Sequence, residues 1–169
     1  MPPLAVTRTY LEMRSPGDLF PAREPAPGPR IERVGGSPIS FWRYLYAEVG
    51  RAYHWTDRLA WSDRDVAAYL GSGDVSLHVL YVENAPAGYY ELRRHEDGSV
   101  EIAYFGLLPE YTGRGFGGWT LTRAVSDAWQ SGASRVWLHT CTLDHPSALP
   151  NYRRRGFIPY KTETFDTEA

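Results

Sequence analysis

Residues 107–123 read LLPEYTGRGFGGWTLTR and join three predicted elements without a gap. An apolar run ends at Pro109, a loop with four glycines follows, and the next residues have the spacing of an amphipathic helix. The first backbone N–H groups of a helix have no partner inside it, and the helix dipole favours an anion there. The segment therefore predicts a site for a phosphorylated ligand where a strand meets a helix.

The residues before this loop predict an antiparallel meander. Three apolar stretches follow one another with only the short turns 83–85 and 95–98 between them, and such turns favour antiparallel pairing. These stretches are Val75–Val82, Pro86–Arg94 and Ser99–Leu108. Helices are predicted from apolar spacing and capping residues over Ser40–Gly50, Ser62–Leu70, Gly117–Gln130 and Ser147–Arg155. Two further strands are predicted over Arg135–Thr140 and Phe157–Thr164.

The N-terminal part adds a strand and a connection. Val6–Met13 is rich in β-forming residues, and Arg30–Val34 reads as a short strand. Pro16–Pro29 holds five prolines and is expected to run in extended form over the surface. A length of 169 residues fits one domain, 1–169, in which residues 1–29 supply the N-terminal strand and the proline-rich connection.

Composition argues against several classes of protein. The net charge of −2 lacks the basic excess of a nucleic-acid binder, so no nucleic-acid partner is expected. We expect no membrane partner, because no segment has the roughly 18–20 apolar residues that a membrane-spanning helix needs. One cysteine and an N-terminus without a signal-peptide pattern predict a cytoplasmic protein. The five histidines have no metal-ligand spacing, and no metal is predicted.

The glycines alone leave three interpretations open. Gly113, Gly115 and Gly118 satisfy G-x-G-x-x-G, but a dinucleotide fold needs a parallel unit and an acidic residue at the next strand end, where His139-Thr140 stands. A P-loop needs Lys-Ser/Thr after its last glycine, and this position reads Trp119-Thr120. A plain connecting turn is the third interpretation.

Two motifs decide among these interpretations. Leu107-Leu108-Pro109-Glu110-Tyr111 followed by Thr112-Gly113-Arg114-Gly115-Phe116-Gly117 resembles motif A of the GCN5-related N-acetyltransferase (GNAT) superfamily. His145-Pro146-Ser147-Ala148 and Tyr152-Arg153-Arg154-Arg155-Gly156-Phe157 resemble its motif B at the usual spacing. Thr112 replaces the family's Arg or Gln, and His145 replaces its usual Asn.

The resemblance implies an α/β (α+β) fold with a mixed, mostly antiparallel sheet, flanked by helices and splayed at the CoA site. The family usually has two strands after motif B, but only one fits before Ala169. We therefore expect Val6–Met13 to take the missing edge position.

The resemblance also implies acetyl-CoA as the acetyl donor. The pantetheine arm would lie along the strand edge at Leu107 and Leu108, and the pyrophosphate would meet backbone N–H groups at the start of the helix. The cofactor-binding residues are predicted to be Leu107, Leu108, Thr112, Gly113, Arg114, Gly115, Phe116, Gly117, Gly118 and Trp119. Arg153–Arg155 either interact with the dipole of their own helix or contact the CoA 3′-phosphate.

Acetyl transfer to a primary amine requires a proton acceptor and a proton donor. Tyr152 stands at the position of the family's general acid, although a core aromatic is the simpler interpretation of a tyrosine there. Glu91 and Glu101 are candidate bases, with a water relay or two solvated carboxylates as the alternatives. Cys141 as an acetylated nucleophile is disfavoured, because lone cysteines are usually small buried residues.

The predicted function is therefore N-acetylation by direct attack of the amine in a ternary complex. The expected acceptor is a small-molecule or peptide amine, and a homodimer is left open. A non-catalytic acyl-CoA-binding module and an interaction domain with a vestigial pocket are the alternatives. Seven aromatic residues between Phe41 and Trp61 either shape the acceptor pocket or pack the core.

Overall fold

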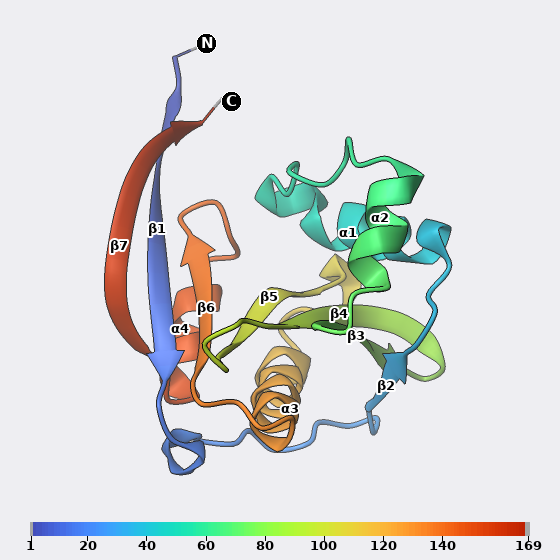
Figure 1. Cartoon of the computed structure of the whole chain (residues 1–169). Coiled ribbons are helices and arrows are strands. Elements are labelled where there is room, and N and C mark those ends of the chain that lie inside the picture. Colours follow the sequence, from blue (N-terminus) through green and yellow to red (C-terminus); the bar gives the residue numbers. More distant parts are fainter. Residues whose placement is uncertain (1, 168–169) are drawn as a thin grey trace.

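Seven strands form one mixed sheet in the order β2-β3-β4-β5-β6-β1-β7, in a computed structural model that describes residues 2–167 (Figure 1). Every neighbouring pair is antiparallel except β5 and β6, so the predicted mostly antiparallel fold is confirmed. The strands are β1 (Leu4–Met13), β2 (Arg30–Val34), β3 (Val75–Val82), β4 (Ala85–Arg94), β5 (Val100–Leu107), β6 (Val136–Cys141) and β7 (Ile158–Thr167). The α-helices are α1 (Ile39–Gly50), α2 (Asp63–Leu70), α3 (Phe116–Gln130) and α4 (Ala148–Arg154).

Helices cover both faces of the sheet (Figure 1). The apolar sides of α1 and α2 pack on β3 and β4, in a cluster that includes Trp42, Leu45 and Val66. On the opposite face α3 and α4 pack against β1, β4, β5 and β6, with Leu121 and Val125 at the centre. The sheet is thus buried on both sides in its middle, as expected of a domain built from layers around a core.

Local chemistry sets the helix starts that matter for the site. Ser62 caps α2, since its side chain accepts a hydrogen bond from the Asp65 N–H at 3.1 Å. The start of α3 has no side-chain cap within residues 2–167, and Gly115 precedes the helix with a φ of 86°. A left-handed φ of this kind favours glycine, so the turn depends on this residue.

The parallel strands β5 and β6 touch only at their beginnings. They pair at Val100–Val136 and Glu101–Trp137 and then separate. Beyond this point β5 keeps only its partner β4, and β6 keeps only its partner β1. The sheet therefore opens between the two strands, as the expected splay requires.

The N-terminal strand does not lie at the edge, and that expectation was wrong. β1 is inserted between β6 and β7, antiparallel to both, and β7 forms the edge instead. Its side chains Val6, Leu11 and Met13 are at most 1% exposed. An inner position covers such a strand on both sides, whereas an edge would leave its apolar residues and one row of backbone groups in water.

The proline-rich connection returns across the molecule along α3 (Figure 1). The Ala22 N–H donates to Thr122 Oγ1 at 2.9 Å, which ties the connection to the second turn of the helix. A Cβ placed on Gly118 would lie 3.2 Å from the Ala22 Cβ, so the connection lies directly beside the first turn. In residues 2–167, no helix combines the length and the apolar character that crossing a membrane requires.

Deletion of residues 1–15 tests the role of β1. Because β7 is held through β1, we expect the truncated chain to melt at least about 10 °C lower or to lose its cooperative transition, given the burial that Val6, Leu11 and Met13 lose. Circular dichroism thermal melts measure this shift, with a deletion of residues 1–3 as the control. An unchanged melting temperature after the longer deletion would contradict this assignment.

Candidate active site

A cleft of about 760 Å³ opens where β5 and β6 separate. Its strand walls come from β5, β6, β1 and the edge strand β7. The 3₁₀ turn η2 (Arg51–Tyr53) with the loop after it, the glycine-rich turn and the start of α4 complete the lining. Residues from the two ends of the chain therefore meet residues from its centre. The cleft joins the glycine-rich turn to a group of titratable side chains, among them Glu101, His139 and Asp144.

The predicted phosphate site forms one end of this cleft. Gly113 has a φ of 73° and lines the cleft together with Thr112 and Gly117. The uncapped start of α3 lies at the same place, so its free N–H groups and positive dipole end are available to an anion. The Thr112 hydroxyl donates to the Pro109 carbonyl at 2.8 Å, so this hydroxyl already has a partner.

The other predicted cofactor residues have different surroundings. Leu107 lines the cleft, while Leu108 packs under α1 in the core. Phe116 and Trp119 are buried in a cluster with β3 and β4, where they anchor the first turn of α3. The Arg114 guanidinium lies 5.1 Å from the centre of the Phe116 ring.

Tyr152 projects into the cleft from α4. Its ring packs edge-on against Phe105 and Phe157 and is 6% exposed. Burial raises the pKa of the phenol well above its usual value, with the charge of Asp144 adding to the effect. The hydroxyl therefore stays protonated at neutral pH and is able to donate a proton.

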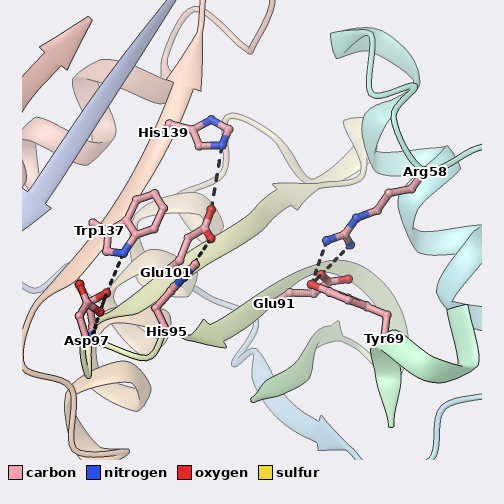
Figure 2. A network of polar contacts seen from close by, with 9 residues as sticks. Arg58, Tyr69, Glu91, His95, Asp97, Glu101, Trp137 and His139 are labelled. Carbon is pink, nitrogen blue, oxygen red and sulfur yellow. Dashed lines mark hydrogen bonds and ion pairs between the residues drawn. The ribbon is translucent and has the colours of Figure 1, made fainter. Parts of the chain in front are cut away.

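Glu101 is the predicted base that lies in the cleft. Figure 2 shows its carboxylate between two histidines, with Oε1 2.9 Å from His95 Nε2 and Oε2 4.0 Å from His139 Nε2. Burial lowers the pKa of His139, and the positive charge of Arg8 lowers it further. A neutral imidazole thus faces the cleft beside a carboxylate.

Glu91, the other predicted base, does not line the cleft. It is fully buried beneath α1 and α2, where Trp42 Nε1 donates to Oε1 at 2.7 Å. Arg58 and Tyr69 donate to Oε2 at 2.8 and 2.7 Å (Figure 2). Its acceptor capacity is occupied within the core, so we assign Glu91 a structural role.

Arg58 is the cation that holds this buried network, and sequence patterns did not single it out. Its guanidinium lies 4.1 to 5.5 Å from four aromatic ring centres. Burial alone would lower its pKa, but the charge and hydrogen bond of Glu91, together with Tyr69 and Tyr104, outweigh burial, and the net direction is upward. The rings belong to Trp42, Trp61, Tyr69 and Tyr104. From the predicted aromatic segment, Trp42 and Trp61 therefore pack around the ion pair, while Tyr53 and Trp55 reach the cleft.

Cys141 and His139 also line the cleft, and His95 contacts Glu101 beside it. Burial raises the pKa of the Cys141 thiol, which disfavours the reactive thiolate. His95 and His139 were missed because one follows β4 and the other lies in β6, so they approach Glu101 only in the fold. In residues 2–167, no group of three or more His, Cys, Asp or Glu side chains could hold a metal ion.

The sequence and the fold both resemble known proteins. The profile of the Acetyltransferase (GNAT) family matches residues 41–157. The chain belongs to this family. The match starts in α1 and ends after α4, so it covers the glycine-rich turn, Glu101 and Tyr152 but not β1 or β7. A comparison with curated protein sequences gives no match.

Solved structures of this GNAT chain's relatives share its fold. A GCN5-related N-acetyltransferase from Kribbella flavida is 24% identical with a TM-score of 0.67, covering 92% of this chain and 55% of that one. One from Sphaerobacter thermophilus is 17% identical with a TM-score of 0.69, covering 96% and 51%. An aminoglycoside acetyltransferase from an uncultured soil metagenomic sample is 15% identical with a TM-score of 0.62, covering 74% and 85%. The chain thus spans about half the length of the first two.

Substitution of Glu91 tests the buried network. Glu91→Ala leaves the Arg58 charge without its partner, and we expect it to destabilise the protein by about 3–5 kcal/mol. Urea denaturation measures this, with Glu48→Ala as a control, since the exposed Glu48–Arg51 pair is worth at most about 1 kcal/mol. Equal effects of the two substitutions would contradict the structural role of Glu91.

Proposed function

We propose that the chain is an acetyl-CoA-dependent N-acetyltransferase that acts on a primary amine. The observation that carries this proposal is one cleft in a GNAT-family fold, with an uncapped glycine-rich helix start at one end and Tyr152 and Glu101 further along. An anion-binding end and a proton-handling centre are the two parts that acetyl transfer from CoA to an amine requires.

The residues at the phosphate end fit a CoA pyrophosphate. Gly117 faces the cleft, and a Cβ there would lie 3.8 Å from Leu107 Cδ1 and 3.9 Å from Asn151 Nδ2. The absence of that side chain lets a ligand approach the backbone closely. Leu107 and the edge of β5 that faces away from β4 would then hold the pantetheine arm. When bound, acetyl-CoA supplies an acetyl group activated as a thioester.

Tyr152 and Glu101 divide the proton transfers. The amine nitrogen forms a bond to the acetyl carbonyl carbon, and the bond between this carbon and the CoA sulfur breaks. Glu101, with His139 beside it, accepts the proton that the amine loses, directly or through a water molecule. Tyr152 lines the same cleft, and its phenol, which is protonated at neutral pH, donates its proton to the departing sulfur.

The high pKa of Cys141 favours direct attack over an acetyl-cysteine intermediate. Amine and thioester must then be bound together, which the size of the cleft permits. Transfer would therefore occur in a ternary complex, with kinetics that lack the ping-pong pattern of a covalent route.

Gly117→Val tests the donor site. The added side chain would fill the place where the backbone meets a phosphate, so we expect the Kd for acetyl-CoA to rise at least about tenfold. Isothermal titration calorimetry measures the Kd, with Gly35→Val as the control, since nothing lies within 4 Å of a Cβ at Gly35. A native protein that does not bind acetyl-CoA would overturn the proposal.

Tyr152→Phe tests the acid. We expect kcat to fall by about 10²–10⁴-fold while acetyl-CoA affinity is kept, since the phenol acts only on the leaving group. A thiol-release assay over an amine panel measures kcat, with Tyr160→Phe as the control because Tyr160 is exposed on β7. Acetyl-CoA binding without turnover of any amine would instead identify a non-catalytic binding module.

A further inference from the structure

One wall of the acceptor end of the cleft comes from outside the segment that matches the family. Val6 and Arg8 of β1 and Phe165 of β7 line the cleft, whereas the family match covers residues 41–157. This part of the cleft is therefore not described by the family match. The side chains of Val6, Arg8 and Phe165 are therefore candidates for determining which acceptor binds.

Arg8 is the cation that this wall contributes. Its guanidinium lies 4.9 Å from the centre of the Phe165 ring, and its Nε is buried without a hydrogen-bond partner among residues 2–167. The nearest carboxylate oxygen, on Glu163, is 4.0 Å from an Arg8 terminal nitrogen. Glu163 is already bound by Lys161 at 2.8 Å and by the Tyr10 hydroxyl at 3.0 Å. The positive charge of Arg8 is thus only weakly balanced by the carboxylate of Glu163.

The other arginines that line the cleft differ from Arg8. Arg58 forms its ion pair with the buried Glu91. Arg93 lies opposite Glu101 in the register of β4 and β5, next to a negative charge. Arg8 alone combines a cleft position with an unsatisfied buried guanidinium nitrogen. A planar guanidinium of this kind suits a carboxylate, which it binds through two parallel hydrogen bonds.

Apart from its arginines and histidines, the charged groups of the cleft are carboxylates, which suit a positively charged group on a ligand whose carboxylate binds Arg8. Glu101, Asp57 and Asp144 line it, and carboxylates attract an ammonium group. Asp144 is held by Thr140 Oγ1 and by the Cys141 N–H at 3.0 Å, so its position is set by the protein. His139 lies near both kinds of charge: its pKa is lowered by burial and by Arg8 and raised by the carboxylates of Glu101, Asp144 and Asp57.

We propose that the acceptor is a small amino-carboxylate, whose carboxylate binds Arg8 while its amine faces Glu101. This inference rests on the proposed function and specifies its substrate class. A polycationic acceptor would place a positive charge against Arg8 and is disfavoured. Phe165, Tyr53 and Trp55 add an apolar surface for the body of the molecule.

The test uses amine pairs that differ only in their carboxylate. Glycine, β-alanine and L-phenylalanine are each compared with their carboxamides, and spermidine serves as the polycation, in the thiol-release assay with acetyl-CoA. The carboxamides have the lower amine pKa and hence more neutral amine at pH 7, which biases the assay against the proposal. We expect at least one carboxylate to have a kcat/KM about tenfold above that of its amide.

Arg8→Gln is expected to lower this carboxylate-to-amide ratio about 10- to 100-fold, mainly through KM, as the loss of a hydrogen bond to a charged group requires. Arg14→Gln is the matched control, because Arg14 follows the same strand and its side chain is 80% exposed. Arg8→Lys keeps the positive charge but cannot form the two parallel hydrogen bonds of a guanidinium, so it should give an intermediate carboxylate-to-amide ratio. Melting temperature and acetyl-CoA affinity verify that each variant is folded.

Binding gives a readout that does not need turnover. Saturation-transfer NMR in the presence of CoA is expected to detect N-acetyl-L-phenylalanine more strongly than its amide in the native protein, with the difference lost in Arg8→Gln. Acetylation of amides or spermidine with equal efficiency, unaffected by Arg8→Gln, would overturn the inference and leave the proposed function standing. No acetylation of any amine would overturn the proposed function. In that case, an NMR difference that is lost in Arg8→Gln would still support a carboxylate site at Arg8, and the absence of any difference would overturn that site.

Discussion

The early separation of β5 from β6 is the constraint on which the rest of this structure depends. Two parallel strands that pair at only two positions leave unpaired backbone groups along both inner edges. Such groups are costly to bury without partners, so the opening must face solvent or a ligand. Each face of the sheet has its own apolar support: α1 and α2 pack on β3 and β4, while α3 and α4 pack on the other face against strands from both sides of the opening.

The buried Arg58–Glu91 pair follows from the same division. The half of the sheet that carries β3 and β4 packs against short helices and an irregular loop, which present few aliphatic side chains. An ion pair enclosed by aromatic rings positions that loop against the sheet, and the same loop supplies Asp57 and Trp55 to the cleft. The pair is best understood as a positioning device, since buried ion pairs add little net stability when compared with apolar packing.

Local patterns predicted the parts of this protein that are built from neighbours in sequence. The meander, the capped α2 and the glycine turn before α3 all depend on residues a few positions apart, and the structure has them within one or two residues of the expected bounds. Glu91 could not be distinguished from Glu101 in this way, because both lie in strands and only the packing of α1 and α2 encloses Glu91 while Glu101 lines the cleft. The inner position of β1 and the approach of His95, His139 and Arg8 also depend on long-range pairing, which leaves no local trace.

The placement of β1 between β6 and β7 also brings the first and last strands side by side. Leu4 lies opposite Thr167 in the antiparallel register of β1 and β7, so the first and last described strands form a hairpin that lacks only its connecting turn. A short turn joining them, with the chain reopened in the proline-rich connection 19–29, would keep every strand beside its present neighbours. The order of strands in the sheet therefore does not depend on a break in the chain at this hairpin. The part of the sheet formed by β6, β1 and β7 needs strands from both ends of the described chain. It can therefore assemble only after β7 has been synthesised, later than the meander of β3, β4 and β5.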